Sequence, residues 1–198
     1  MNVLLLKDLI AIKYNLNKKP IMKIKIKKIN PDIKLPEFID KGEWVDLRAS
    51  NKIIMKAPQA GVLRRKKVND KEISFRDVSF DATLIPLGIA MEIPKGYEAI
   101  ILPRSGTFKN YGITLSNSAG IIDNSYCGDN DEWKFGAIAF RNTTINVGDR
   151  ICQFRVQLSQ KATMWQKIKW LFSSKIEFIE VSHLGNKDRG GFSSTGVK

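Results

Sequence analysis

Apolar and basic residues alternate along the stretch MKIKIKKI at Met22–Ile29, and this period of two is typical of a half-exposed β-strand. Short apolar runs recur along the rest of the chain, and Gly, Pro, Asn and Asp punctuate most of the gaps between them. Many short strands with almost no helical pattern favour an all-β sandwich or barrel. The runs predict strands over 44–48, 52–56, 61–66, 83–91, 98–103, 112–116, 136–141, 150–157 and 176–182.

One stretch of the chain has a helical pattern instead. In ATMWQKIKWLFSS, the apolar residues Met164, Ile168, Leu171 and Phe172 recur at helical spacing. We expect a packed helical insertion there rather than a membrane anchor. Residues 1–21 lack a clear period, and we expect either an N-terminal extension or an upstream start, since Met22 would itself suit as a first residue. The end of the chain, NKDRGGFSSTGVK, has the composition of a mobile tail.

Length and composition indicate one soluble domain. A chain of 198 residues can bury a sizeable core, and no apolar run approaches the ~20 residues that span a bilayer. The opening MNVLLLKDLIAI is interrupted by charges and lacks the cleavage pattern of a signal peptide. Two cysteines and one histidine exclude a disulfide framework and a His-rich metal site. We therefore expect a cytoplasmic protein with reduced thiols and no membrane partner.

The net charge of +13 requires an explanation. It fits a nucleic acid, an acidic surface, a polyanionic small substrate, or a solvated basic face that aids solubility. Much of the excess lies in KKPIMKIKIKK and LRRKKVNDK, where few aromatic residues are available to stack on bases. Nucleic-acid binding is therefore a minor alternative for the main function.

Two glycine-containing motifs suit phosphate oxygens. PRSG brings together the guanidinium of Arg104, the hydroxyl of Ser105 and the flexible backbone of Gly106. GGFSSTG, at 190–196, could fold its amides around an anion, although it does not match the Walker pattern. Its further candidate ligands are the ring of Phe192 and the hydroxyls of Ser193, Ser194 and Thr195. Each motif alone also fits an ordinary turn or a Gly/Ser tail.

Three further polar residues stand out in otherwise apolar surroundings. Gln153 in GDRICQF could donate to a phosphate, and Asp46 in WVDLRAS could pair with an arginine. In SNSAGIIDNSYCGD, Asp123 follows two isoleucines and precedes Tyr126 by three residues. Apolar neighbours raise the pKa of a carboxyl toward the range that suits a general base. We therefore expect the pKa of Asp123 to be raised.

The order of these motifs resembles the five motifs of the trimeric dUTP diphosphatases (dUTPases). DLRA, LPRSG with YGITLSN, GIIDNSYCG, GDRICQF and GGFSSTG follow one another in the family's order. The resemblance covers the chain from Met22 to Lys198. It implies a jelly-roll-like β-sandwich that forms a homotrimer with three shared active sites and an exchanged C-terminal segment. Residues 22–186 then form the β domain, with insertions near 57–80 and 161–176, and residues 187–198 form a glycine-rich lid over a neighbouring site.

The resemblance also implies an activity, the hydrolysis of dUTP to dUMP and pyrophosphate by water attack on the α-phosphate. Asp123 would be the general base, and Tyr126 would pack on the sugar and exclude a 2′-hydroxyl. Asp46 would orient Arg104 or water around Mg²⁺, which the triphosphate holds, so that no residue is a direct metal ligand. Uracil would be read by Asn117 and the hairpin backbone at Gly120 and Ile122. Phosphates would be held by Arg104, Ser105, Gly106 and Gln153, and the lid would contribute Phe192, Ser194 and Thr195, with Phe192 stacked on uracil.

The sequence departs from the family pattern in three places. The arginine that opens the fifth motif normally precedes its phenylalanine by five residues, where this chain has Lys187, while Arg189 precedes Phe192 by three. Either the lysine substitutes, without the bidentate fork, or Arg189 takes the role. Cys127 replaces a common arginine, and DNDEWK lengthens the chain after Gly128. Neither that addition nor the two insertions has a purpose that can be derived from the sequence.

Two alternatives remain open at this point. A dCTP deaminase shares the fold but needs a glutamate at the base, and the hairpin has none nearby. A regulatory or binding protein of dUTPase type could instead act through its basic insertions on nucleic acid or on another protein. Salt-sensitive retention on nucleic acid would favour that reading.

Overall fold

The structure is a computed structural model that describes residues 21–38, 42–172 and 175–191. Residues 1–20 of the expected N-terminal extension and residues 192–198 of the expected lid lie outside the described ranges. The elements are β1 (Ile21–Lys28), β2 (Val45–Arg48), β3 (Ile53–Met55), β4 (Gln59–Val68), β5 (Lys71–Ser79), β6 (Ala82–Pro86), β7 (Ile89–Glu92), β8 (Tyr97–Pro103), α2 (Thr107–Tyr111), β9 (Ile113–Leu115), β10 (Gly120–Asp123), β11 (Lys134–Ala139), β12 (Thr143–Ile145), β13 (Arg150–Leu158), α3 (Met164–Phe172) and β14 (Lys175–Glu180).

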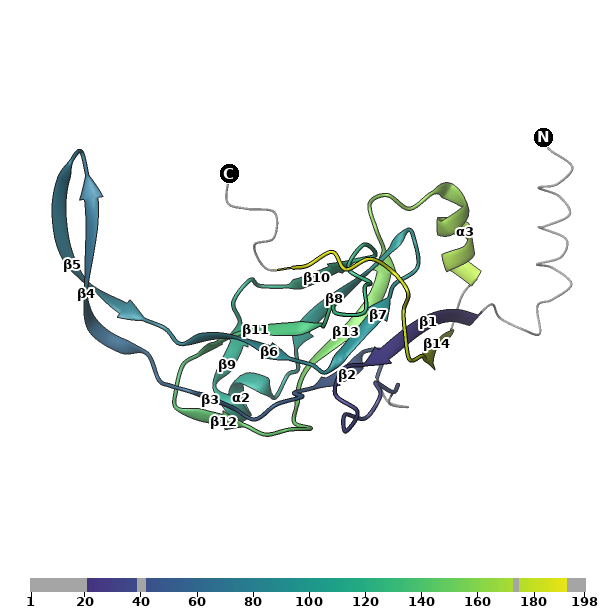
Figure 1. The fold of residues 1–198 in the computed structure, drawn as a ribbon, viewed down its shortest axis with the longest axis horizontal. Helices are drawn as coiled ribbons and strands as arrows, with labels where there is room; N and C mark the ends of the chain where they lie inside the picture. The colour runs from purple at the N-terminus through teal and green to yellow at the C-terminus, as the bar shows by residue number, and fades with distance from the viewer. Residues whose placement is uncertain (1–20, 39–41, 173–174, 192–198) are drawn as a thin grey trace, which may run out of the picture.

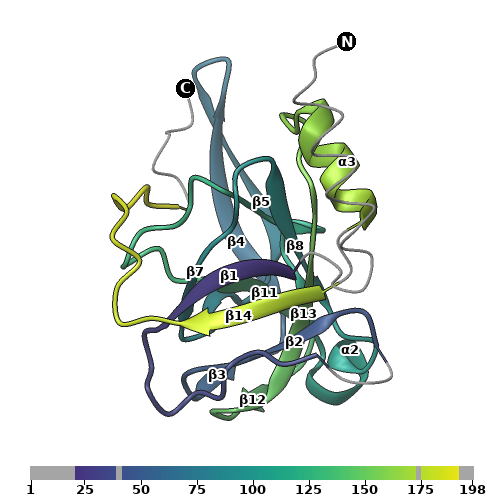
Figure 2. The same ribbon diagram turned by 90° about the vertical axis from the view of Figure 1, so that its right-hand side faces the viewer.

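The strands form small sheets that enclose one core, so the all-β, jelly-roll-like sandwich is confirmed (Figure 1). A four-stranded sheet has the order β10-β8-β13-β2, and two three-stranded sheets have the orders β14-β1-β7 and β6-β11-β9. In β1, the isoleucines Ile24 and Ile26 are fully buried, as the period of two predicted. Figure 2 shows β1 between β7 and β14, with β14 parallel to it. The core centres on Trp133, Phe135 and Phe154.

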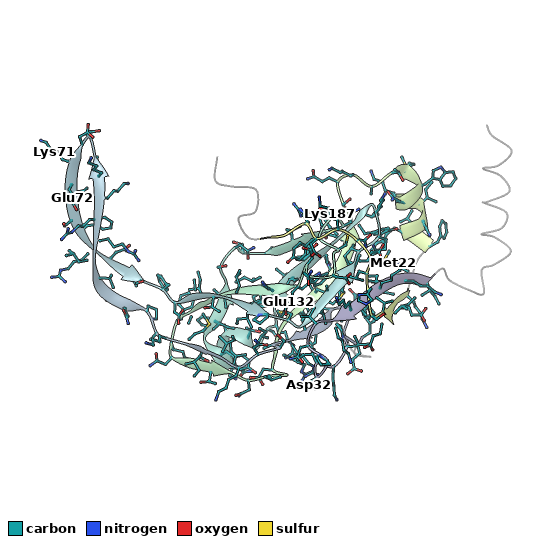
Figure 3. All side chains as sticks on the ribbon, in the orientation of Figure 1. Met22, Asp32, Lys71, Glu72, Glu132 and Lys187 are labelled. Atoms are coloured by element: carbon teal, nitrogen blue, oxygen red, sulfur yellow. The ribbon has the colours of Figure 1, made fainter. Side chains whose placement is uncertain are left out.

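The basic insertion is a two-stranded arm, β4–β5 (Gln59–Ser79), that projects from the body (Figure 1). The sequence predicted a strand only over 61–66, and β5 was missed. The turn between the strands has Asn69 and Asp70 at φ 48° and 61°, as a two-residue hairpin loop requires. Lys71 and Glu72 lie at the tip, far from Glu132 in the body (Figure 3).

Other predictions of single elements need correction. The predicted strand 83–91 is two strands, because the chain turns at Gly88, where φ is +71°. The short strands β10 and β12 and the five-residue helix α2 were not predicted. Helix α3 is confirmed, but its apolar stripe is not packed against the chain: Met164 is 70% exposed and Leu171 79%. The helix contacts the body instead through Trp170, whose ring lies 5.5 Å from that of Tyr97, and through Gln166, whose Nε2 donates to the carbonyl of Lys95 at 2.6 Å.

Within the described residues, neither α2 nor α3 has the length and apolarity that crossing a membrane would require.

Candidate active site

The four-stranded sheet turns one face to the core and the other outward, and most of the predicted polar site residues come from the outward face or its edges. In β2, Val45 and Leu47 are buried and Asp46 lies between them, so alternation directs its side chain away from the core. Gln153 on β13 is paired with Asp46 in the strand register and is half-buried. Neighbouring strands therefore bring these two residues of different motifs side by side.

Asp46 connects two arginines at one corner of this sheet. Its Oδ1 accepts a hydrogen bond from Nε of Arg104 at 2.7 Å, and its Oδ2 accepts one from Nη1 of Arg150 at 3.1 Å. The carboxylate is nearly buried, whereas both guanidinium groups are partly exposed. The two cations are thus oriented side by side, with donors left for an anionic ligand. Arg150 is not among the site residues predicted from the sequence. The available signal was the position of this arginine in the GDRICQF motif, three residues before Gln153.

A buried threonine shapes the turn that carries Ser105 and Gly106. The hydroxyl of Thr107 accepts a hydrogen bond from the backbone N–H of Arg104 at 3.0 Å and donates to the carbonyl of Ile151 at 2.7 Å. This ties the end of β8 to the start of β13, so the turn and the arginine pair keep a fixed relation. Thr107 was also missed, because one threonine after a Ser-Gly pair gives no distinctive signal.

The predicted uracil-reading residues lie on the predicted hairpin, which consists of the turn after β9 and of β10; β9 itself pairs with β11, whereas β10 pairs with β8. Asn117 is exposed in the turn, next to Ser118, which has a φ of 62°. Gly120 faces Ile101 of β8 so closely that an added Cβ would lie 3.3 Å from the Cβ of Ile101. Ile122 packs against the core. The hairpin is therefore held against β8, and its backbone at the turn remains accessible.

Asp123 ends β10, and its carboxylate is 44% exposed. It accepts hydrogen bonds from the backbone N–H of Ser125 at 2.9 Å and from the Ser125 hydroxyl, and Nη1 of Arg189 lies 2.5 Å from its Oδ2. Burial by itself raises the pKa of Asp123, but the Ser125 hydrogen bonds and the charge of Arg189 together lower it below the ordinary value. The expectation of a raised pKa is therefore wrong, because it considered only the apolar neighbours in sequence.

Tyr126 lies just beyond Asp123 and is 8% exposed. Its hydroxyl donates to the carbonyl of Glu132 at 2.9 Å. Burial raises its pKa to about 12, with a contribution from the negative charge of Asp131. An added Cβ on Gly191 would lie 3.1 Å from the Tyr126 ring, so the end of the described chain lies against this ring.

The two candidates for the fifth-motif cation differ in position. Arg189 pairs with Asp123, whereas Lys187 is exposed and the described residues show no hydrogen bond or ion pair for its side chain. Residues 187–191 lie along the chain's own loop after β10, with Asp188 bonded to Asn130 at 2.7 and 2.9 Å. Phe192, Ser194 and Thr195 lie outside the described ranges.

The site residues fall into two clusters at opposite corners of the sheet. Asp123 pairs with Glu98, whereas Asp46 is level with Leu102, four residues further along β8. Strand geometry makes this offset about 13 Å along the strands and about 14 Å across three strand spacings, roughly 20 Å in all. One cluster contains Asp123, Tyr126 and Arg189, and the other contains Asp46, Arg104, Arg150 and Gln153. Within one chain, the two clusters are therefore separate groups of side chains.

Neither cluster is built to hold a metal ion by itself. Within the described ranges, no group of three or more His, Cys, Asp or Glu side chains is arranged around a common point. Both oxygens of Asp46 already accept from arginines. A pocket of about 480 Å³ lies elsewhere, and no predicted site residue lines it.

Comparisons of the sequence match this chain to known proteins. The family model described as dUTPase matches residues 71–169. The SPbeta prophage-derived deoxyuridine 5′-triphosphate nucleotidohydrolase YosS of Bacillus subtilis is 41% identical over 177 residues, which cover 89% of this chain and 100% of the relative.

Solved structures share the fold at lower identity. A dUTPase from Streptococcus mutans aligns with a TM-score of 0.53 and 17% identity, over 70% of this chain and 98% of that one. A mutant dUTPase from phage phi11 of S. aureus, described as coordinating a structural Mg(II) ion, aligns with a TM-score of 0.52 and 14% identity, over 71% and 94% of the two chains.

Proposed function

The chain belongs to the dUTPase family, and we infer from this membership that it hydrolyses dUTP to dUMP and pyrophosphate. The cluster of Asp123, Tyr126 and Arg189 supports placing this activity at the candidate site, because these residues come from the family's third and fifth motifs. Neither a dCTP deaminase nor a purely regulatory protein is favoured, because the matching relative is named as a dUTP hydrolase.

We propose that Asp123 is the general base. Its carboxylate is charged at neutral pH, because its pKa is low, and it is exposed enough to accept a proton from water. The water oxygen would bond to the α-phosphorus as the bond to the bridging oxygen of pyrophosphate breaks, and the water proton would pass to Asp123. The two hydrogen bonds from Ser125 support this role, since they hold the carboxylate in one orientation.

We propose that the second cluster binds the phosphates. Arg104 and Arg150 supply charge that compensates the triphosphate, and Asp46 keeps their guanidinium groups in place. Ser105, Gly106 and Gln153 add neutral donors next to them. Mg²⁺ bound to the triphosphate would neutralise further charge and help to orient it. The uracil edge would be read by Asn117 and the hairpin backbone at Gly120 and Ile122, and Tyr126 would contact the sugar.

We propose that the active protein is a homotrimer whose sites combine residues of different subunits. A general base must lie within hydrogen-bond reach, or one water, of its target. The roughly 20 Å estimated between Asp123 and Asp46 is too far for both to serve one triphosphate in one chain. In an oligomer, the hairpin of one subunit can lie beside the arginines of another, so that Asp123 and the phosphate-binding arginines reach the same triphosphate. The same proposal includes the expectation that residues 192–198 cover a neighbouring subunit's site.

We also place the protein in the cytoplasm. Cys127 and Cys152 are both unpaired in the described structure, which fits a reducing compartment.

The experiment that tests the function is the release of pyrophosphate from dUTP, dCTP, dTTP and UTP in parallel with Mg²⁺. We expect turnover of dUTP alone. Equal turnover of UTP would overturn the role of Tyr126 in excluding a 2′-hydroxyl. No turnover by a correctly folded protein would overturn the activity itself.

A further inference from the structure

The loop after β10 contains a buried carboxylate that the dUTP chemistry does not use. Asp131 is 1% exposed. Its Oδ2 accepts hydrogen bonds from the backbone N–H groups of Gly128 and Arg189, both at 2.9 Å, and its Oδ1 accepts one from that of Gly190 at 3.0 Å. Two consecutive amides of a distant segment thus converge on one charged acceptor, in a geometry that favours strong hydrogen bonds.

Neighbouring contacts hold the same two segments together. We name them the acidic loop (128–132) and the C-terminal segment (184–191), and the latter is the yellow end of the ribbon in Figure 1. Asp129 accepts from the N–H of Leu184 at 2.9 Å, and Asp188 accepts from Asn130. At Gly128 an added Cβ would lie 2.5 Å from the Cα of Asp188, so the backbones meet where only glycine fits.

We propose that Asp131 is a positioning residue that fixes the C-terminal segment for catalysis. Its two bonds fix the backbone at Arg189 and Gly190, which places the Arg189 side chain at Asp123 and Gly191 against the Tyr126 ring. This inference rests on the proposed function, since the segment is taken to act on dUTP. It gives the acidic loop, whose DNDEWK sequence had no derivable purpose, a defined role.

The first variant to make is Asp131→Asn. The asparagine amide has the shape of the carboxylate, but an NH₂ group replaces one of the two oxygens. This donor would then face a backbone N–H, which is also a donor. Gly128→Ala tests the same docking without touching the charge, since its methyl group meets the Asp188 backbone. Gly128→Ala also allows the docking to be tested if Asp131→Asn does not fold. The matched control is Asp70→Asn at the tip of the arm, where the side chain is fully exposed and φ is 61°, a conformation that asparagine tolerates.

Limited digestion with trypsin reads out the docking directly, because Lys187 and Arg189 lie within the segment. We expect Asp131→Asn and Gly128→Ala to be cut at these two positions about 10- to 100-fold faster than wild type, as loss of charge-assisted hydrogen bonds implies. The cut sites are mapped by mass spectrometry. Asp70→Asn should be cut there at the wild-type rate. Unchanged cutting in both test variants would overturn the proposal.

Kinetics test whether the docking matters for the reaction. We expect Asp131→Asn to lower kcat/KM for dUTP about 10-fold or more, with Asp70→Asn unchanged. In the full chain carrying Arg189→Gln, the same substitution should lower kcat/KM by a smaller factor, because Asp131 acts partly through the Arg189 side chain. An undiminished effect in Arg189→Gln, or normal kinetics with fast cutting, would overturn the positioning role. Failure of wild type to hydrolyse dUTP would overturn the proposed function, and the digestion would still decide the docking.

Discussion

Arg189 and Asp123, 66 residues apart in sequence, form an ion pair with Nη1 2.5 Å from Oδ2. One is the proposed general base and the other the proposed cation of the fifth motif. The side chains of both residues are 44% exposed, so the ion pair lies at the surface. Removing this charge from Asp123 would raise the pKa of the carboxylate and make it a stronger base. Under the proposed function, in which Arg189 binds the triphosphate, this binding would make Asp123 a stronger base.

Arg189, and not Lys187, should supply the fifth-motif cation. Arg189→Gln is expected to raise KM for dUTP by about 10-fold or more, as loss of a charged hydrogen bond implies. Lys187→Gln, which removes the same charge two residues earlier, is expected to leave KM within about twofold, because the described residues show no hydrogen bond or ion pair for the Lys187 side chain. Steady-state kinetics on both variants decides the assignment. A larger effect of Lys187→Gln would reverse it.

Asp123→Asn should abolish turnover and leave binding largely intact. The amide keeps the shape of the carboxylate but cannot take a proton from water, so kcat should fall by about 10²- to 10⁴-fold. Calorimetric titration with dUTP should still show binding close to that of wild type, because phosphate and uracil contacts remain. Retained turnover would remove Asp123 as the base.

The low pKa of Asp123 predicts how stability depends on pH. Because the folded state favours the charged carboxylate, this group stabilises the fold above the ordinary aspartate pKa of about 3.9 and loses that contribution as pH falls through the lower folded value. The free energy of unfolding of wild type should therefore exceed that of Asp123→Asn at pH 7, and the difference should shrink below about pH 4. Urea unfolding at several pH values measures this. A difference that grows in acid would mean that the pKa is raised instead.

Asp46 should act through Arg104 and Arg150. Asp46→Asn is expected to lower kcat/KM about 10- to 100-fold, because two guanidinium groups lose their shared charged partner. A double-mutant cycle of Asp46→Asn with Arg104→Ala should give a coupling energy of about 0.5–3 kcal/mol. Asp77 on the arm also pairs with an arginine, Arg64, at 3.2 Å, so Asp77→Asn is a matched control that should have no effect. Additive effects in the cycle would contradict an orienting role.

Shared sites predict complementation between two inactive variants. Asp123→Asn lacks the base and Arg104→Ala lacks a phosphate ligand, but a site built from one subunit of each type can still contain both intact residues. Co-refolding in equal amounts should restore about a quarter of the sites, since each site draws its two clusters from different subunits at random. Each variant refolded alone is the control. Failure to recover activity in verified mixed oligomers would place both clusters of a site in one chain.

Local patterns were sufficient for much of the fold. The period of two in β1 identified its buried isoleucines, because a strand places alternate side chains on opposite faces. The same reasoning located most strands and helix α3. It failed where the determining contact is not local. Gly88 divides a continuous apolar run into two strands, and Met164 and Leu171 in the apolar stripe of α3 are exposed instead of packed against the core.

By itself, the sequence determined the all-β class, the family, and the identity of most candidate residues, since these depend on the order and spacing of side chains. Only the tertiary structure decided how those residues combine. In the structure Asp46 pairs with Arg150, and Asp123 pairs with Arg189. The pKa of Asp123 is lowered instead of raised, and the acidic loop binds the C-terminal segment. The physical reason is that ion pairs and hydrogen bonds between distant segments leave no periodic trace in sequence, while a pKa depends on every charge and donor that folding brings near.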